Sequence, residues 1–367
     1  MSTDRLMRIL SGADRGVQAR LARAALAMLS PGYAAAVSVR NGLFDLGVRS
    51  SADLGRPTLS VGNLTVGGTG KTPMVIELAQ RLLRQSVRPA VLLRGYRPRG
   101  GRAGRASSGL SDEAALLAQE LGPAVPVEAG ADRCRSARTV LARFPDVGAF
   151  ILDDGFQHRQ VRRDVDLVLI DALRPFGFDH LLPRGLLREP ASSLRRASGV
   201  IVTRADQVSP DELARLDKRV ADWAGKPPLA HVAYRWAALR EGAEPRPIEA
   251  IGSMRVAGVS GVGNPEAFER SLRQAAGEVV WHRAMGDHHE YDARELEQLA
   301  AQARSSGVQA IVTTEKDWVK WARLVAGRPL PVPVLRPVVA AVFLDGAAAV
   351  DTLLERMVNP LDKEASR

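Results

Sequence analysis

The sequence predicts an α/β protein with a parallel sheet and a second, smaller α/β domain. Short apolar runs alternate with helical patterns along most of the chain, which is typical of a parallel sheet flanked by helices. The chain has 367 residues, more than one hydrophobic core usually holds. Most of the apolar runs end in a polar or glycine residue, and ligands bind at the carboxyl ends of the strands in such sheets.

The first domain is expected at residues 51–228, after an N-terminal helical segment at residues 1–50. Glycine and proline in the segment Gly225–Pro228 mark its end. Its predicted strands are Thr58–Val61, Ala90–Leu93, Ala149–Leu152, Leu167–Ile170 and Val200–Val202.

The second domain is expected at residues 229–345, and residues 346–367 form a C-terminal helix and tail. Two connecting strands are predicted at Leu229–Leu239 and Val332–Phe343. Between them the pattern predicts a strand at Val256–Val259, a helix from Pro265 and a strand at Ala310–Thr313. The last helix, Ala347–Met357, is expected to return to the first domain.

Composition and charge limit the classes of function. The chain has 51 Lys and Arg against 41 Asp and Glu, and its net charge of +10 attracts nucleic acid, anionic lipid or phosphorylated substrates. The sequence has no zinc pattern, no aromatic-interleaved basic patch and no helix-turn-helix, so nucleic acid is not expected as a partner, nor is an obligate protein partner. The single cysteine, Cys134, excludes an internal disulfide and fits a reducing compartment.

The N-terminal segment is both basic and apolar. Residues 1–50 contain seven Arg and three Asp, and the longest uncharged stretch, Ala24–Val39, includes Pro31. This stretch is too short and too broken to predict a membrane span, but it suits a basic helix that lies on a membrane surface. A pair of helices packed against the core explains the pattern equally well.

A glycine-rich sequence follows the first predicted strand and precedes a helical run at Val75–Leu83. Residues 60–72 read SVGNLTVGGTGKT, which is the strand–loop–helix context of a phosphate-binding loop. Such a loop turns backbone N–H groups toward phosphate oxygens, and the following helix adds its positive end. The Thr72 hydroxyl is expected on Mg²⁺. The residues predicted to bind the nucleoside triphosphate are Thr65, Gly67, Gly68, Thr69, Gly70, Lys71 and Thr72.

The strand Ala149–Leu152 ends in two carboxylates, Asp153 and Asp154. An acidic group at a buried strand end is the second element that a magnesium–nucleotide site needs. Successive strand residues point to opposite faces, so the two carboxylates are expected to differ in role, and which one supports Mg²⁺ stays open. A strand-end cap is the competing interpretation. Together with the loop, the pair predicts a protein that moves the γ-phosphoryl group.

Residues 153–158 read DDGFQH and resemble the D-D-G-x-Q-H motif of the tetraacyldisaccharide 4'-kinase family. The glycine-rich loop is similar to the variant loop of that family, which accounts for Thr65 at a position where the standard pattern has glycine. The resemblance covers roughly residues 20 to 345. Further similar segments occur in the family's order: RGY at 94–96, LPRGLLREP at 182–190, SGVGNP at 260–265, DHHEY at 287–291 and TTEKD at 313–317.

The resemblance implies an enzyme that uses ATP and Mg²⁺ to phosphorylate the 4'-hydroxyl of a tetraacyldisaccharide 1-phosphate, a lipid substrate of lipid A biosynthesis. It also implies two α/β domains joined by a two-stranded linker. Its N-terminal helix would dock on the cytoplasmic face of the bacterial inner membrane, so a peripheral or shallowly embedded protein is expected.

The resemblance further implies the catalytic side chains. The base proposed for the family lies in a G-D-E-P motif; residues 111–114 read SDEA, so Asp112 is the expected base in an altered loop. His288 matches the histidine proposed to work with that aspartate, and Lys71 completes the catalytic set. Asp112 and His288 fall in different predicted domains, so domain closure would complete the site. Without the resemblance, residues 111–113 predict only a helix N-terminus.

Candidate substrate contacts are Arg94, Arg188, Glu189 and His158. Arg188 suits bidentate binding of a substrate phosphate, although an ordinary Arg188–Glu189 surface pair explains the motif equally well. His158 is expected to position one of the strand-end aspartates, with simple packing as the alternative. Arg94 follows the second strand, where it could meet a phosphate group.

Two other classes of protein compete. Residues 200–206 read VIVTRAD, which is similar to the guanine-reading [NT]-K-x-D motif with Arg204 in place of lysine. A GTP-binding switch protein is therefore one alternative, and a comparison of ATP and GTP turnover separates it. A basic nucleic-acid-binding ATPase is the other alternative. Weak and salt-dependent DNA binding is not sufficient evidence for it, because a net charge of +10 predicts such binding by itself.

Overall fold

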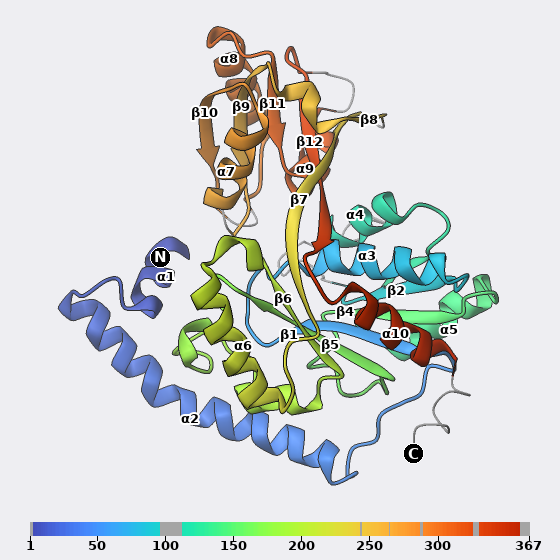
Figure 1. Cartoon of the computed structure of the whole chain (residues 1–367). Helices are drawn as coiled ribbons and strands as arrows, with labels where there is room; N and C mark the ends of the chain where they lie inside the picture. The colour runs from blue at the N-terminus through green and yellow to red at the C-terminus, as the bar shows by residue number, and fades with distance from the viewer. Residues whose placement is uncertain are drawn as a thin grey trace, which may run out of the picture. The chain divides into compact units, whose positions relative to one another are not determined.

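The computed structural model describes residues 3–95, 112–242, 244–263, 265–286, 289–325 and 330–359. The chain forms two compact units (Figure 1): unit 1 comprises Met1–Tyr234 and Ala341–Arg367, and unit 2 comprises Arg235–Ala340. Strands β7 (Ala230–Glu241) and β12 (Val334–Phe343) each belong partly to one unit and partly to the other. Unit 2 is therefore inserted in the sequence of unit 1, and the two strands connect them.

The pairs from β7 to β3 in the sheet of unit 1 are all parallel, which confirms the predicted fold class. Its strand order is β7–β6–β5–β1–β4–β2–β3. Because β4 is the neighbour of β1, the glycine-rich loop after β1 and the carboxylates at the end of β4 lie side by side at the carboxyl edge. Besides β7, the strands are β1 (Thr58–Asn63), β2 (Pro89–Leu93), β3 (Val127–Ala129), β4 (Ala149–Asp153), β5 (Val165–Asp171) and β6 (Gly199–Thr203).

Helices cover both faces of this sheet. Strand residues alternate in direction: Leu59 and Ile151 pack with α3, α4 and α10, whereas Phe150 packs with α5 and Val168 with α6. The C-terminal helix α10 thus belongs to the core of unit 1. The helices are α3 (Lys71–Arg84), α4 (Asp112–Leu121), α5 (Arg133–Arg143), α6 (Pro210–Ala224) and α10 (Ala347–Val358), with short 3-10 helices η1 (Gly177–Asp179), η2 (Ala191–Arg196) and η3 (Ala205–Gln207).

The N-terminal segment forms α1 (Thr3–Ser11) and the long helix α2 (Val17–Asp45), which lies along unit 1 (Figure 1). One side of α2 is bound to the loop that follows η1: the Ser30 hydroxyl lies 3.3 Å from the Leu181 carbonyl, and the Tyr33 hydroxyl lies 3.0 Å from the Arg188 carbonyl. Within the described ranges, none of the helices combines the length and the hydropathy that a bilayer span requires.

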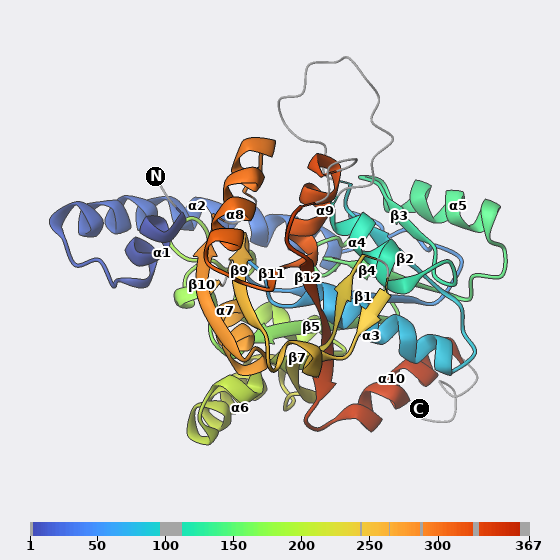
Figure 2. The same ribbon diagram turned by 90° about the horizontal axis from the view of Figure 1, so that it is seen from above.

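Unit 2 has a smaller parallel sheet, β10–β9–β11–β12, and the second part of β7 lies beside β12. Figure 2 shows α8 and α9 on one face of this sheet and α7 on the other. Leu299 and Trp321 belong to the core on the first face, and Phe268 and Leu272 to that on the second. The elements are β8 (Glu244–Arg246), η4 (Ile248–Ile251), β9 (Arg255–Ser260), α7 (Pro265–Ala275), β10 (Glu278–Ala284), α8 (Ala293–Ser305), β11 (Ala310–Thr313) and α9 (Glu315–Leu324).

Candidate active site

The turn between β1 and α3 has the geometry of a phosphate-binding loop. β1 is buried along its whole length, and α3 begins at Lys71. Gly67 and Gly70 have φ of 122° and 82°, in the left-handed region that favours glycine. Gly70 is the N-cap of α3, so the first N–H groups of the helix are available to an anion at this end.

The Lys71 ammonium is held at the mouth of this loop. It lies 3.2 Å from Asn63 Oδ1 and 3.4 Å from Asp154 Oδ1. Asn63 is fully buried, and its amide donates to the Thr65 carbonyl at 2.8 Å. Gln157 donates to the Asn63 carbonyl at 3.0 Å. Asn63, for which the sequence pattern predicted no role, links the end of β1, the loop and the lysine.

Thr65 is buried and bound to the chain around Leu187. The two residues form an antiparallel bridge, Val66 N–H donates to the Leu186 carbonyl at 2.8 Å, and Arg188 N–H donates to the Leu64 carbonyl at 2.7 Å. The first half of the loop is therefore fixed by a neighbouring segment. This anchoring gives a physical reason why the loop keeps its shape without glycine at position 65.

Asp154 lies in an electropositive setting. It adopts a left-handed backbone conformation with φ of 53°, and both its carboxylate oxygens accept from Arg188 Nη1, at 2.9 and 2.8 Å. Burial by itself raises the pKa of Asp154, but the charges of Lys71 and Arg188 and their hydrogen bonds outweigh it and lower the pKa. Arg188 thus pairs with Asp154, and the alternative of an Arg188–Glu189 surface pair is wrong.

Asp153 lies in the opposite electrostatic setting. It is 3% exposed, and among the described residues its Oδ1 has no hydrogen-bond partner. Burial, with the charge of Glu113 adding to it and that of Lys71 opposing it, raises the pKa of Asp153 to about 7. Thr69 Oγ1 is likewise buried and unpartnered within the described part of the chain. Both oxygens are therefore open to a ligand as far as the described residues are concerned.

Arg133 is a residue of this site that the sequence analysis missed. It is the first residue of α5 and is 3% exposed, and it donates to the Gly130 carbonyl. Burial lowers its pKa to about 10, against the charges of Asp153 and Asp154. Burial and the charge of Arg133 together lower the pKa of His158. That His158 positions one of the two aspartates stays a prediction. The only signal in the sequence was Asp132, the N-cap of α5.

Glu189 does not lie where a substrate contact would place it. It is fully buried, and its carboxylate accepts from Arg40 at 3.2 Å, from Asn41 at 2.9 Å and from Arg196 at 2.9 Å. Two of these donors belong to α2. Because both oxygens accept hydrogen bonds from residues of the protein, Glu189 holds α2 against the rest of unit 1, and the predicted substrate contact is replaced by this role.

The other predicted side chains are described to different extents. Arg94 is exposed after β2, and its charge reaches Arg133 and His158. Asp112 is the first residue of α4, but its side chain lies outside the described part of the structure. Its neighbour Glu113 acts on the pKa of Asp153, which brings the start of α4 into electrostatic range of the site. His288 lies outside the described residues.

The segment that is similar to a guanine-reading motif binds other parts of the protein through Arg204. Arg204 forms an ion pair with Asp171 at the end of β5 and donates to the Gly68 carbonyl at 3.1 Å. The side chain that would stand in for the motif's lysine is therefore committed to the phosphate-binding loop and not to a base.

A parallel sheet, a glycine-rich loop at the start of a helix and carboxylates on the adjacent strand define a P-loop nucleotide-binding protein. Comparison with known proteins is more specific. A family model described as tetraacyldisaccharide-1-P 4'-kinase matches residues 22–358, and the chain belongs to this family. The match was anticipated by the ordered motifs of the sequence.

Individual relatives agree with this assignment. A tetraacyldisaccharide 4'-kinase of Anaeromyxobacter dehalogenans (strain 2CP-C) is 42% identical over 313 residues, covering 82% of each chain. One of Halothermothrix orenii is 33% identical over 340 residues, covering 87% of this chain and 88% of the relative. The crystal structure of LpxK from Aquifex aeolicus in complex with ATP is 28% identical, with a TM-score of 0.70 over 92% of this chain and 99% of that one.

Proposed function

We propose that the protein transfers the γ-phosphoryl group of ATP to the 4'-hydroxyl of a tetraacyldisaccharide 1-phosphate in lipid A biosynthesis, with the catalytic centre at the end of β1 and β4. The observation that carries the assignment of the centre is the cluster of Lys71, Asp154 and Arg188 beside the buried Asp153. Phosphoryl transfer needs positive charge around the transferring group and a carboxylate near the metal, and this cluster supplies both.

The residues present fit a magnesium ion. Thr72 is the second residue of α3, and Asp153 has a buried oxygen that lacks a partner among the described residues. A carboxylate and a hydroxyl are the few protein ligands that Mg²⁺ takes when phosphates and water complete its shell. When bound, the ion would neutralise charge on the phosphates. Asp153 is therefore proposed as the carboxylate on the metal side, and Asp154 as the group that orients Lys71 and Arg188.

The acceptor hydroxyl needs a base, because its own pKa is far above neutrality. Asp112 is proposed for this role, supported by the position of α4, whose second residue, Glu113, acts electrostatically on Asp153. His288 is proposed to hold Asp112 ionised. Both roles rest on the family motifs.

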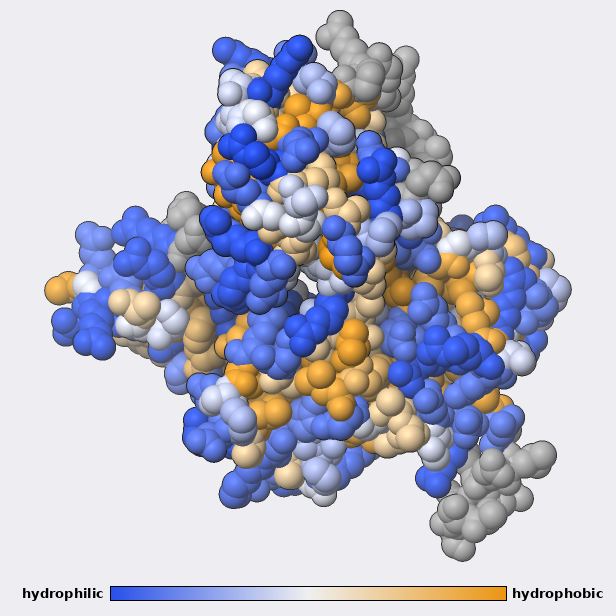
Figure 3. All heavy atoms as spheres, turned by 45° about the horizontal axis from the view of Figure 1, so that its top comes forward, coloured by the Kyte–Doolittle hydropathy of each residue, from blue (hydrophilic) through white to orange (hydrophobic). Residues whose placement is uncertain are grey.

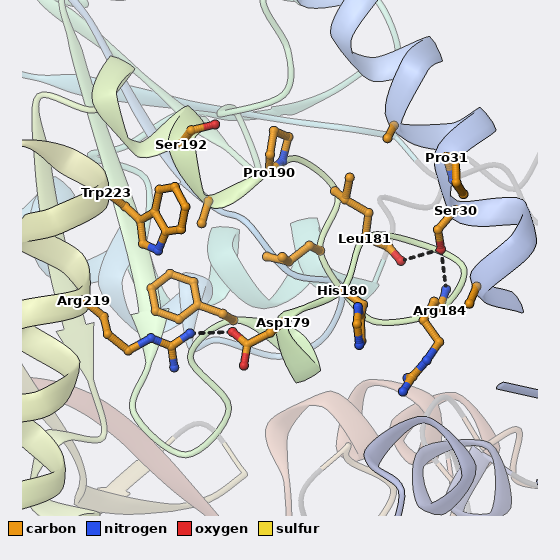
Figure 4. Close-up of a pocket in the computed structure, with 15 residues that line it drawn as sticks. Ser30, Pro31, Asp179, His180, Leu181, Arg184, Pro190, Ser192, Arg219 and Trp223 are labelled. Carbon is orange, nitrogen blue, oxygen red and sulfur yellow. Dashed lines mark hydrogen bonds and ion pairs between the residues drawn. The ribbon is translucent and has the colours of Figure 1, made fainter. Parts of the chain in front are cut away.

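A cavity of unit 1 is proposed as the site for the lipid part of the substrate. A cavity of about 510 Å³ lies between α2 and the segment that leads from η1 to η2. Figure 4 shows Pro31 on α2, Leu181 and Pro190 in this segment and Trp223 on α6 around it, with the Arg219–Asp179 ion pair at one side. Because its lining is mostly apolar, we propose that it receives acyl chains of the disaccharide.

The outer side of α2 is proposed to lie on the inner membrane at its cytoplasmic face. Val17, Leu21, Met28 and Val39 are all exposed, Met28 by 82%, and at 100° per residue they fall within about 40° of one another around the helix. In Figure 3 the lobe of α1 and the start of α2 is mainly hydrophilic on the visible face. An apolar stripe next to basic residues is the pattern of a helix at an anionic lipid surface.

A radiolabelled-ATP assay with the lipid disaccharide tests the function, with glycerol and a nucleoside as control acceptors. Lys71→Ala and Asp112→Ala are each expected to lower turnover by at least about a hundredfold. Lys218→Ala, a change at an exposed lysine of α6, is the matched control and should leave turnover unchanged. Near-normal activity of Asp112→Ala would remove that residue as the base, and label in the control acceptors alone would remove the lipid assignment.

A further inference from the structure

Three consecutive backbone carbonyls of the phosphate-binding loop are each bound by a side chain from outside the loop. The Gly68 carbonyl accepts from Arg204 at 3.1 Å, and the Gly70 carbonyl accepts from the Tyr234 hydroxyl at 2.7 Å. Between them, the Thr69 carbonyl lies 3.2 Å from the Thr203 hydroxyl, which is 3.4 Å from its other acceptor, the Ile170 carbonyl. The donors come from the end of β6, the residue after it, and β7.

This arrangement follows from what a phosphate-binding loop requires. Its N–H groups must turn toward the anion, so its carbonyls turn away from it and need donors on the other side. The Gly70 carbonyl also accepts from the Met74 N–H of α3, at 3.4 Å. If the Gly68 and Thr69 carbonyls were bound only by water, their peptide planes could rotate freely between orientations. Fixed donors on three successive carbonyls hold three peptide planes, and thereby the N–H groups that follow Gly68, Thr69 and Gly70, in one orientation.

The three donors are themselves fixed. Thr203 is fully buried, and Tyr234 packs so closely on Gly70 that any side chain at position 70 would overlap its ring. Arg204 has a left-handed backbone with φ of 54°, pairs with Asp171 and stacks over the Tyr234 ring at 5.8 Å. A non-glycine residue in this conformation costs free energy, which indicates that the surroundings determine its position.

We propose that Thr203, Arg204 and Tyr234 form an outer brace that sets the orientation of the loop N–H groups for the triphosphate, and that they are positioning residues for ATP. The inference deepens the proposed function and rests on it, because it gives the segment at residues 200–206 a role at the same nucleotide site. The brace does not touch the nucleotide. It acts through the backbone of residues 68–70.

The first test is Tyr234→Phe, which removes one hydroxyl and keeps the ring against Gly70. Affinity for the magnesium complex of a non-hydrolysable ATP analogue is expected to weaken about fivefold, because one hydrogen bond that orders the loop is lost. The KM for ATP should rise by a similar factor, while the KM for the lipid acceptor stays unchanged. A merely structural tyrosine would instead lower the urea midpoint of the nucleotide-free protein and leave both nucleotide constants unchanged, and that result would overturn the brace.

The second test is Arg204→Lys, which cannot reach Asp171 and the Gly68 carbonyl together as a guanidinium does. The same weakening of analogue binding is expected. Arg88→Lys is the matched control, because Arg88 likewise binds a carboxylate, Asp146, and a loop carbonyl, that of Ala124, away from this site. Arg204→Lys also introduces the lysine that the guanine-reading motif has at this position. An increase in GTP turnover would therefore assign the segment to base recognition and refute the brace.

Lys71→Ala separates this inference from the proposed function. If Lys71→Ala loses binding of the ATP analogue while Tyr234→Phe and Arg204→Lys bind it like the unchanged protein, only the brace is wrong. If Lys71→Ala binds the analogue normally, the nucleotide site itself is misassigned, and the proposal of the brace is wrong as well.

Discussion

Two buried carboxylates of unit 1, Asp153 and Glu189, show how differently one fold can treat the same chemical group. Glu189 accepts three hydrogen bonds from donors of which two are arginines, so its charge is compensated within the protein. Asp153 is almost as deeply buried, yet one of its oxygens has no partner among the described residues and its pKa is raised to about 7. A compensated buried charge stabilises the fold, whereas the uncompensated charge of Asp153 makes it a candidate for binding a ligand.

The largest effect is expected for Asp153→Asn. Turnover should fall on the order of a hundredfold, because the carboxylate proposed for the metal side is lost. The free energy of unfolding at about pH 8 should stay the same or rise, since a carboxyl whose pKa is raised in the fold destabilises the folded state at any pH above its unfolded pKa. Radiolabel assays and urea titration measure the two quantities. A clear loss of stability would place Asp153 in the same class as Glu189.

Glu189→Gln should show the reverse pattern. The free energy of unfolding is expected to fall by about 2 kcal/mol, because Arg40 and Arg196 lose their counter-charge while partly buried. Affinity for the ATP analogue should change little. Urea titration with analogue binding on the same samples checks this, and a selective loss of acceptor binding without loss of stability would restore Glu189 as a substrate contact.

The exposed side of α2, which Glu189 helps to hold in place, gives the next prediction. Leu21→Glu together with Met28→Glu should lower partitioning onto vesicles of anionic phospholipid by about tenfold, since two apolar side chains no longer insert. Gln18→Glu with Ser38→Glu adds the same charge to α2 without removing apolar area and serves as the control. Equal loss in both variants would reduce the interaction to charge alone.

The smallest effect concerns a third carboxylate setting, in which Asp217 and Asp345 flank His231. Burial alone lowers the pKa of His231, but its hydrogen bonds to both carboxylates, at 3.0 and 2.7 Å, outweigh burial and raise it. The stabilisation is complete below the unfolded pKa of about 6.5 and is lost as pH rises through the higher folded value. Urea titrations from about pH 6 to about pH 9 should show this loss of stability with increasing pH. His231→Gln should reduce the loss to the part that the raised pKa of Asp153 contributes. His180→Gln, at an exposed histidine, should keep the full loss.

The features that the sequence predicted well are those that a few consecutive residues determine. A local sequence pattern predicts the glycine-rich loop and the strand before Asp153. The same is true of the long strands that connect the two units. β3 and β8 have three residues each, and β10 has an irregular register between Val279 and Trp281, so no regular apolar period was available to predict them.

The roles of individual side chains were predictable only where a neighbour in sequence decided them. Arg188 and Glu189 are adjacent, but they serve the aspartate at β4 and the helix α2 respectively, and both partners lie far away along the chain. Arg133 reaches the site only because β3 places α5 beside it. α2 continues through Pro31, although a proline inside a helix removes one backbone hydrogen bond.

The position of α10 has a consequence for biosynthesis. Val350, Leu354 and Met357 are buried in the same core as the first helix after the glycine-rich loop, and Asp351 binds Arg81 of that helix at 2.7 Å. Translation delivers these residues only after all of Arg235–Ala340 has left the ribosome. Unit 1 therefore cannot complete its hydrophobic core until α10 has been synthesised. Unit 2 is the first of the two units that can fold to completion.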